Sequence, residues 1–210
     1  MKKTFILLNL LFSFCFLVPL SAQTEKPDAL KLYRANKFKE AIVVCENELS
    51  LNPNNMDSYS VLCWSLLSNR QYQEAEQRAA EAHKINSYDI RIIEALGEAK
   101  YYLNKYNEAL NMFQRYVANA NEDAARMGRV YFLMGEIYVN QSKFEHADIS
   151  YSMAVKIEPL MDFWWTRLGW ARESLKNYKS AIEAYDNALK LNPSQYDANR
   201  GKARCSEKLS

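Results

Sequence analysis

A small side chain recurs along this chain at nearly constant intervals. The steps between successive members of this row are 34, 34, 38, 34 and 34 residues. The members are Ala29, Cys63, Gly97, Gly135, Gly169 and Ala203. A single period over most of the chain predicts a repeated structural unit. Units of this length bury their apolar faces against one another, so the chain is expected to form a stacked scaffold.

Further rows share the same period. An aromatic residue follows each of the first five small residues at a fixed offset, an alanine comes three residues later, and a third row lies four residues beyond that alanine. The rows are Phe38, Tyr72, Tyr106, Phe144 and Tyr178, then Ala41, Ala75, Ala109, Ala147 and Ala181, then Cys45, Ala79, Phe113, Tyr151 and Tyr185, with Pro53, Pro159 and Pro193 closing three units. This arrangement resembles the tetratricopeptide repeat family. The fullest matches are the units containing Gly135 with Pro159 and Gly169 with Pro193.

The resemblance implies an all-α, right-handed solenoid of five helix pairs with a capping helix at the C-terminal end. The expected divisions are a signal peptide at 1–22, repeats at 23–55, 56–89, 90–127, 128–161 and 162–195, and the capping helix at 196–210. The third repeat carries four extra residues. Because Asn121 is a good N-cap followed by acidic residues, we expect the next helix to begin early, near Asn121.

Helix contacts follow from the same rows. Two helices approach closely only where side chains are small, so Gly135 and Gly169 are expected to face Ala147 and Ala181. The first helix is expected to be short, because Pro27 fits only in a first turn.

The N-terminus has the pattern of a secretory signal peptide. Lys2 and Lys3 precede an apolar run, and Leu20-Ser21-Ala22 offers a cleavage site. An uncleaved anchor is the alternative, although the apolar run is shorter than the roughly 20 residues of a spanning helix. Lipidation at Cys15 is a further, less favoured alternative. Cleavage predicts a periplasmic or secreted protein with no membrane span.

Charge and cysteine content limit the partners. The chain has 27 basic and 25 acidic residues, and cleavage would remove two lysines, leaving a neutral chain. Nucleic acid is therefore not an expected partner. The mature chain would keep Cys45, Cys63 and Cys205, an odd number, so at least one has no partner within the chain. Cys45 and Cys63 either form a disulfide or fill the core, and the second reading is favoured.

Catalysis is not expected. The two histidines, His83 and His146, lie in units a whole repeat apart, with no nucleophile or metal partner, and read as surface or cap residues. The sequence contains no phosphate-binding glycine loop, zinc motif or nucleophile elbow. The chain is therefore interpreted as a non-enzyme without a cofactor or metal.

The resemblance places the working surface on the first helices, which line a concave groove. Its expected partner-binding residues are Trp64, Arg91, Glu98, Tyr101, Arg129, Phe132, Glu136, Phe163, Trp170 and Arg200, with Leu30 beside them. Each aromatic has the alternative of covering helix contacts, but together they indicate an interface. The expected partner is a protein or extended peptide with apolar anchors and basic groups opposite Glu98 and Glu136.

The sequence thus predicts an exported scaffold that binds other proteins, as an adaptor in cell-envelope assembly. The alternative is a structural component that self-associates, forming homo-oligomers through its exposed faces. An enzyme would need a constellation of reactive groups that the sequence does not show.

Overall fold

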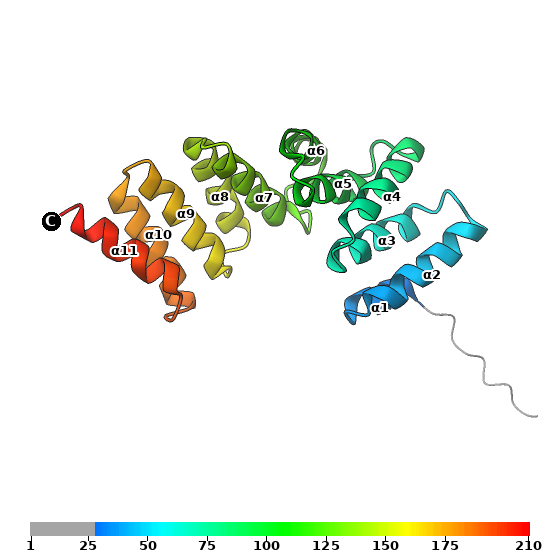
Figure 1. Ribbon diagram of the computed structural model, residues 1–210, viewed down its shortest axis with the longest axis horizontal. Helices are drawn as coiled ribbons and strands as arrows, with labels where there is room; N and C mark the ends of the chain where they lie inside the picture. Colours follow the sequence, from blue (N-terminus) through cyan, green and yellow to red (C-terminus); the bar gives the residue numbers. More distant parts are fainter. Residues whose placement is uncertain (1–27) are drawn as a thin grey trace, which may run out of the picture.

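The computed structural model describes residues 28–210, and the predicted signal peptide lies outside them. Within that part the chain is all-α and forms an arch of stacked helices, with the concave side at the lower edge of Figure 1. The helices are α1 (Ala29–Arg34), α2 (Phe38–Leu51), α3 (Met56–Ser68), α4 (Tyr72–Ile85), α5 (Ile90–Tyr102), α6 (Tyr106–Asn119), α7 (Met127–Asn140), α8 (Phe144–Ile157), α9 (Asp162–Ser174), α10 (Tyr178–Leu191) and α11 (Tyr196–Glu207). None of these helices is long and apolar enough to cross a bilayer.

The turn inside each helix pair has the same geometry. A residue with positive φ follows each first helix, and the next N–H bonds back to a carbonyl of that helix. The five turn residues are Asn36, Arg70, Asn104, Ser142 and Lys176. A left-handed residue with such a backward bond is a common helix ending. Side chains also cap the N-termini of several first helices, as Asp28, Asn55 and Asp89 do for α1, α3 and α5.

Aromatic rings, not the predicted alanines, cover the glycines. A Cβ on Gly135 would lie 2.5 Å from the ring of Tyr151, and one on Gly169 would lie 2.6 Å from the ring of Tyr185. The tyrosine ring is thus the nearest group to each glycine, while Ala147 and Ala181, on the same second helices, are fully buried. The absent glycine side chain leaves a space that the flat ring fills.

The two ends of the stack differ from its middle. The first helix has only six residues, as the position of Pro27 predicts. Ala203, the last member of the small-residue row, is exposed, since no helix follows α11 within residues 28–210. The packed face of α11 instead carries Ala198, Gly201 and Cys205, all of them buried.

The four extra residues do not extend α7, which begins at Met127, so the expected early start near Asn121 is wrong. The Asn121 carbonyl accepts a hydrogen bond from the Ala124 N–H, and the Ala124 carbonyl accepts one from the Met127 N–H. These two turns pack Ala124 against the core between α5 and α7. They also place Arg126 on the concave side of the arch, directly before α7.

The cysteines settle the disulfide question in this structure. Cys45, Cys63 and Cys205 are all free thiols, and all are buried. Cys45 and Cys63 belong to one apolar cluster of α1–α5. Burial raises the pKa of the Cys45 thiol to about 12, with further increases from Glu48 and Glu46. Both side chains act as core fillers.

Candidate partner-binding groove

The first helix of each pair supplies most of the residues that line the cavities of the molecule. Three cavities lie over α1, α3 and α5, and a fourth lies over α9 and α11. The predicted groove therefore exists as a concave surface built mainly from the odd-numbered helices. It has two parts, which the longer connection before α7 separates.

Arginines of one unit bind carboxylates of the preceding unit along this surface. Arg129 donates to both carboxylate oxygens of Glu98, with its Nε 3.1 Å from Oε2. Arg167 Nε lies 2.6 Å from Oε1 of Glu136. In both pairs the arginine lies 31 residues after the glutamate, and Arg204 repeats the spacing with Glu173. We call these three pairs the arginine ladder.

The arginine ladder pairs the two glutamates that were expected to meet basic groups of a partner. Glu98 is only 3% exposed and is bound by Arg129, and Glu136 is held by Arg167 and by the Tyr151 hydroxyl. A basic group of a partner would therefore have to share these carboxylates with a cation of the chain or displace that cation. Their first task is to hold successive units together.

The N-terminal part of the groove centres on two neighbouring acidic side chains of α5. Glu94 is 1% exposed, and its Oε2 accepts a hydrogen bond from the Trp64 indole at 3.2 Å. Burial raises the pKa of Glu94 to about 8. The positive charge of Arg126 acts to lower this pKa, and the neighbouring Glu98 raises it further. Burial also acts to raise the pKa of Glu98, but the hydrogen bonds and charge of Arg129, together with Glu94 and the charge of Arg126, lower the pKa overall.

Arg126 completes this cluster. Its guanidinium lies 5.2 Å from the centroid of the Trp64 ring, and its Nη1 lies 3.5 Å from Glu94 and 3.7 Å from Glu98. Its Nη2 donates to the Tyr33 hydroxyl at 3.3 Å, which links the connection before α7 to α1. Neither Arg126 nor Glu94 is among the residues predicted from the sequence.

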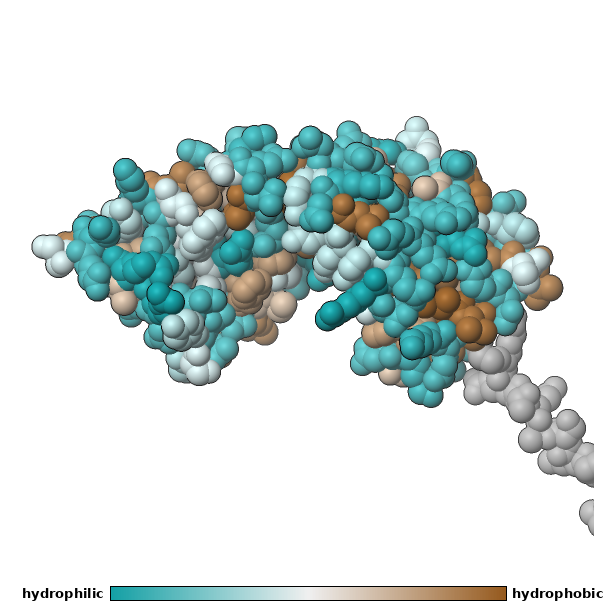
Figure 2. Space-filling view, in the orientation of Figure 1, coloured by the Kyte–Doolittle hydropathy of each residue, from teal (hydrophilic) through white to brown (hydrophobic). Residues whose placement is uncertain are grey.

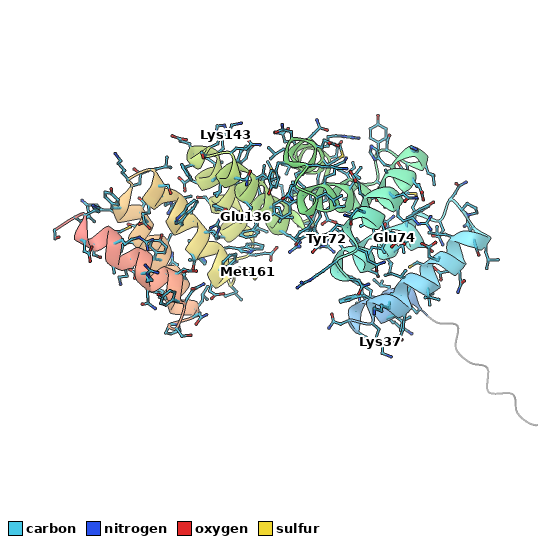
Figure 3. All side chains as sticks on the ribbon, in the orientation of Figure 1. Lys37, Tyr72, Glu74, Glu136, Lys143 and Met161 are labelled. Carbon is cyan, nitrogen blue, oxygen red and sulfur yellow. The ribbon has the colours of Figure 1, made fainter. Side chains whose placement is uncertain are left out.

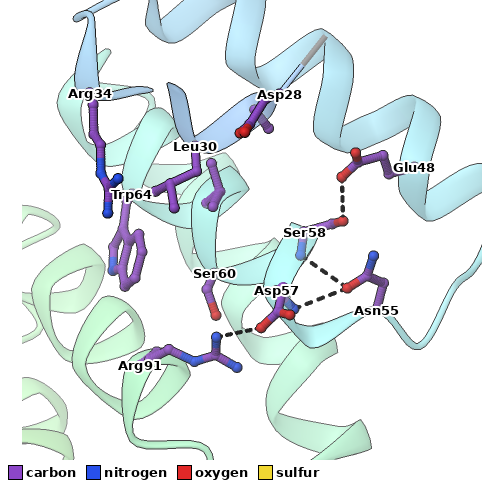
Figure 4. Close-up of a pocket in the computed structure, with 12 residues that line it drawn as sticks. Asp28, Leu30, Arg34, Glu48, Asn55, Asp57, Ser58, Ser60, Trp64 and Arg91 are labelled. Atoms are coloured by element: carbon purple, nitrogen blue, oxygen red, sulfur yellow. Dashed lines mark hydrogen bonds and ion pairs between the residues drawn. The ribbon is translucent and has the colours of Figure 1, made fainter. Parts of the chain in front are cut away.

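Arg91 and Leu30 lie at the outer edge of this part, around the cavity drawn in Figure 4. Arg91 Nη1 lies 2.6 Å from Oδ1 of Asp57 on α3, and its Nη2 lies 2.7 Å from Oδ2 of Asp89. Leu30 lies close to Trp64 in the same view. Arg91 therefore has a structural role in joining α3 to α5.

Tyr101 does not face this cavity. It is half-buried between the rings of Tyr102 and Tyr106, with centroid distances of 5.2 and 6.0 Å, and it packs against the core of α5–α7. Burial raises its pKa to about 12. Its position is that of a packing residue.

The C-terminal part of the groove presents exposed apolar side chains beside a cavity whose lining is mainly polar. Phe132 stacks on the buried Trp164 at 5.0 Å and touches Phe163, which is 47% exposed. Met161 is also exposed there. In Figure 3 Met161 lies at the edge of the arch that borders the opening, and Figure 2 shows apolar surface at that place. Aromatic and apolar side chains on a concave edge are typical of an interface.

Charged groups border the same surface. The Arg167 guanidinium lies 5.0 Å from the Trp170 ring, which is half-buried and meets Phe144 edge-on. Arg200 is exposed, lies over the Tyr196 ring, and forms no ion pair within residues 28–210. A cavity of about 300 Å³ joins these groups. Its lining includes Phe163, Thr166, Arg167, Trp170, Asp197 and Arg200.

The arch is thus an α-solenoid of stacked helix pairs with a concave surface of aromatic and charged side chains. Tetratricopeptide repeat models match residues 128–159 and 163–195, and the model of anaphase-promoting complex, cyclosome, subunit 3 matches residues 34–116. The chain belongs to the tetratricopeptide repeat family.

Curated relatives match over part of their length. The chain is 30% identical over 90 residues to the chloroplastic tetratricopeptide repeat domain-containing protein PYG7 of Arabidopsis thaliana, covering 42% of this chain and 30% of that protein. It is 26% identical over 148 residues to the BBSome complex member BBS4 of Bos taurus, covering 70% of this chain and 28% of that protein. The chain therefore spans less than a third of the length of either relative.

Solved structures share the fold. MamA of Desulfovibrio magneticus has a TM-score of 0.67 and 20% identity, covering 80% of this chain and 93% of that one. Pseudomonas aeruginosa pilF has a TM-score of 0.74 and 14% identity, covering 86% and 81%. YrrB, described as a TPR protein with an unusual peptide-binding site, has a TM-score of 0.66 and 20% identity, covering 83% and 88%.

Proposed function

We propose that this protein is an exported scaffold that holds an extended segment of a partner protein along its concave surface. The family supports a role in protein interaction, and YrrB offers a fold relative that is described with a peptide-binding site. The observation that carries the proposal is the C-terminal part of the groove. There, exposed Phe163, half-buried Trp170 and the unpaired cation of Arg200 surround one cavity.

The aromatic side chains at that cavity suit an apolar anchor of the partner, and the polar and charged groups of its lining suit the polar atoms beside that anchor. A partner side chain placed against Phe163 and Trp170 would remove aromatic surface from water, which is the main source of affinity at such hot spots. Arg200 would select for a carboxylate nearby, since its own charge is not cancelled. The groove is preformed, so little ordering free energy opposes binding.

A selected peptide tests the proposal. Panning a random phage-displayed library on the purified protein should enrich peptides that bind wild type, and their affinities can then be measured by calorimetry. Phe163→Ala and Trp170→Ala should weaken binding by about ten-fold or more each. Ile149→Ala removes an apolar side chain that is 65% exposed on α8, and should leave affinity unchanged.

Circular dichroism must show that each variant keeps its helical content. Failure to enrich any peptide, or equal affinity for wild type and the two groove variants, would overturn the proposal.

Export and a place in cell-envelope assembly complete the proposed role. They are supported by the pattern of residues 1–22, which resembles a secretory signal. Mass spectrometry of the protein recovered from its own cells should find an N-terminus at Gln23 in the extracytoplasmic fraction. A cytoplasmic protein that retains Met1 or Lys2 would contradict this part of the proposal. Self-association, the alternative from the sequence, is tested by mass measurement at several concentrations.

A further inference from the structure

The N-terminal part of the groove already holds a guanidinium group. Arg126 reaches residues of three different units: Tyr33 on α1, Trp64 on α3, and Glu94 and Glu98 on α5. It comes from the longer connection before α7, not from a helix that lines the surface. The side chain is 26% exposed, so it lies against the groove wall and remains accessible from the concave side.

The fit of Arg126 is incomplete. Its distances to the two carboxylates, 3.5 and 3.7 Å, are those of ion pairs and exceed normal hydrogen bonds. The Oε1 atom of Glu94 is buried and accepts no hydrogen bond from residues 28–210. Buried acceptors are rarely left in that condition. An acceptor of this kind, in the wall of a groove, indicates room for a better-placed donor.

A cavity adjoins this acceptor. It has a volume of about 510 Å³ and lies between α1, α3, α5 and the connection before α7. Its lining includes Leu30, Tyr33, Trp64, Ile90, Glu94 and Tyr116, with Arg126 at one side. The walls are mainly apolar, with Arg34, Arg91, Asn121 and Asp123 also in the lining, and Glu94 and the Trp64 face lie where Arg126 is held. An apolar stem that ends in a planar cation matches these walls.

We propose that this part of the groove recognises an arginine side chain of the bound partner segment, and that Arg126 occupies the site until the partner displaces it. The inference deepens the proposed function and rests on it, because it assumes a partner in the groove. Arginine fits better than lysine, since a planar guanidinium both stacks on an indole and donates to the neighbouring carboxyl groups of Glu94 and Glu98. Two carboxylates and one indole face already hold such a group in this structure.

Because Arg126 occupies this part of the groove, the apparent affinity for a partner arginine is lower than it would be at a vacant site. The partner's arginine binds only the fraction of molecules whose site is vacant, so removal of Arg126 should raise affinity by the inverse of that fraction. The apolar anchor at the C-terminal part of the groove is unaffected by this competition. The two parts of the groove can therefore be tested separately.

The first experiment uses the isolated side-chain group. N-methylguanidinium should raise the thermal midpoint of Arg126→Ala in a saturable manner, because a ligand that binds only the folded state stabilises it. N-methylurea has the same shape without charge and should not raise it, and methylammonium should raise it less. Wild type, whose site is filled, and the double variant Arg126→Ala/Glu94→Gln should respond weakly. Equal responses of Arg126→Ala and wild type would overturn the inference.

The second experiment uses an extended peptide. The probe is acetyl-Ser-Leu-Ser-Arg-Ser-Leu-Ser-amide, with a counterpart that carries glutamine in place of arginine. Arg126→Ala should bind the arginine peptide about ten-fold more tightly than wild type does, and should bind the glutamine peptide no more tightly. Equal gains for both peptides would mean that Arg126 only blocks space, which would contradict arginine recognition.

A third measurement does not depend on the folding of the variant. In wild type, the Nε–Hε resonance of Arg126 should shift as the arginine peptide is added in excess, and should not shift with the glutamine peptide. An unchanged resonance at saturation would overturn displacement. If the inference fails while Phe163→Ala and Trp170→Ala still weaken the selected peptides, the proposed function stands. If those peptides also bind normally, both fail.

Discussion

The two parts of the groove use the same repeat position in different ways. Glu98 and Glu136 each follow the glycine of their unit, Gly97 or Gly135, by one residue, and each is bound by an arginine of the next unit, Arg129 or Arg167. Around Glu98, whose side chain is 4% exposed, a second acidic side chain and Arg126 fill the space. Around Glu136, whose side chain is 19% exposed, a tyrosine hydroxyl donates and the neighbouring aromatics remain open. The same repeat position thus belongs to a buried charged cluster in one part and lies beside exposed aromatic side chains in the other.

The largest expected effect concerns the packing beneath the open part. Gly135→Leu should lower the free energy of unfolding by about 3 kcal/mol, because its Cβ alone would lie 2.5 Å from the buried Tyr151 ring. The corresponding positions in the N-terminal part are Gly97, which also packs against an aromatic ring, and Cys63, where Cys63→Ala should cost only about 1 kcal/mol. Urea denaturation followed by circular dichroism measures both. Similar losses for the two variants would mean that the crossings are equally tight.

The next effect separates the two rungs directly. Arg129→Ala should cost about 2 kcal/mol, since it removes the hydrogen bonds of a buried carboxylate. Arg167→Ala should cost about 1 kcal/mol, because Glu136 is more exposed and keeps the Tyr151 hydroxyl. Chemical denaturation at neutral pH and moderate salt gives both values. Equal losses would remove the distinction between a closed and an open part.

A smaller effect is the pH dependence that Glu94 gives to the closed part. The pKa of Glu94 is raised by burial from 4.5 to about 8, so the folded protein keeps a proton that the unfolded chain releases. This contribution to stability is complete below the unfolded pKa and is lost as pH rises through the folded pKa. Between about pH 5 and about pH 8, wild type should therefore lose stability relative to Glu94→Gln.

Thermal midpoints across that pH range test this expectation. Glu98, whose pKa is lowered, contributes in the opposite direction, and its effect lies below the same window. Parallel curves for wild type and Glu94→Gln would contradict the raised pKa.

The smallest effect is expected at the outer edge of the closed part. Asp57 pairs with Arg91, but its side chain is 85% exposed. Asp57→Asn should change the free energy of unfolding by about 0.5 kcal/mol or less, because exposed ion pairs contribute little. The same denaturation assay measures this change. A loss as large as that of Arg129→Ala would show that the exposed fraction of a side chain does not predict how much its ion pair contributes to stability.

The fold followed from the sequence because its rows are local and periodic. Small residues such as Gly135 and Ala147 recur at the same positions of successive units, and the short first helix follows from Pro27. The groove was predicted residue by residue from the first helices, but the ion pairs among its members were not. The ladder could have been found, since a 31-residue spacing joins Glu98 to Arg129 and recurs twice.

Arg126 could not have been found in that way. Its place depends on how four extra residues fold between two units, and the helix-capping pattern at Asn121 favoured another conformation. The burial of Glu94 depends on the same connection. Sequence periodicity says nothing about an insertion that breaks it.

The tyrosine rings over the glycines link the interior of the stack to its inner surface. The ring of Tyr151 covers Gly135 and its hydroxyl donates to Glu136, while Tyr185 covers Gly169 and donates to Glu173 at 2.7 Å. One side chain therefore serves both the folding of a helix pair and the charge of the surface that faces a ligand. A substitution of either tyrosine would therefore change the packing of a helix pair and the charge of the concave surface together.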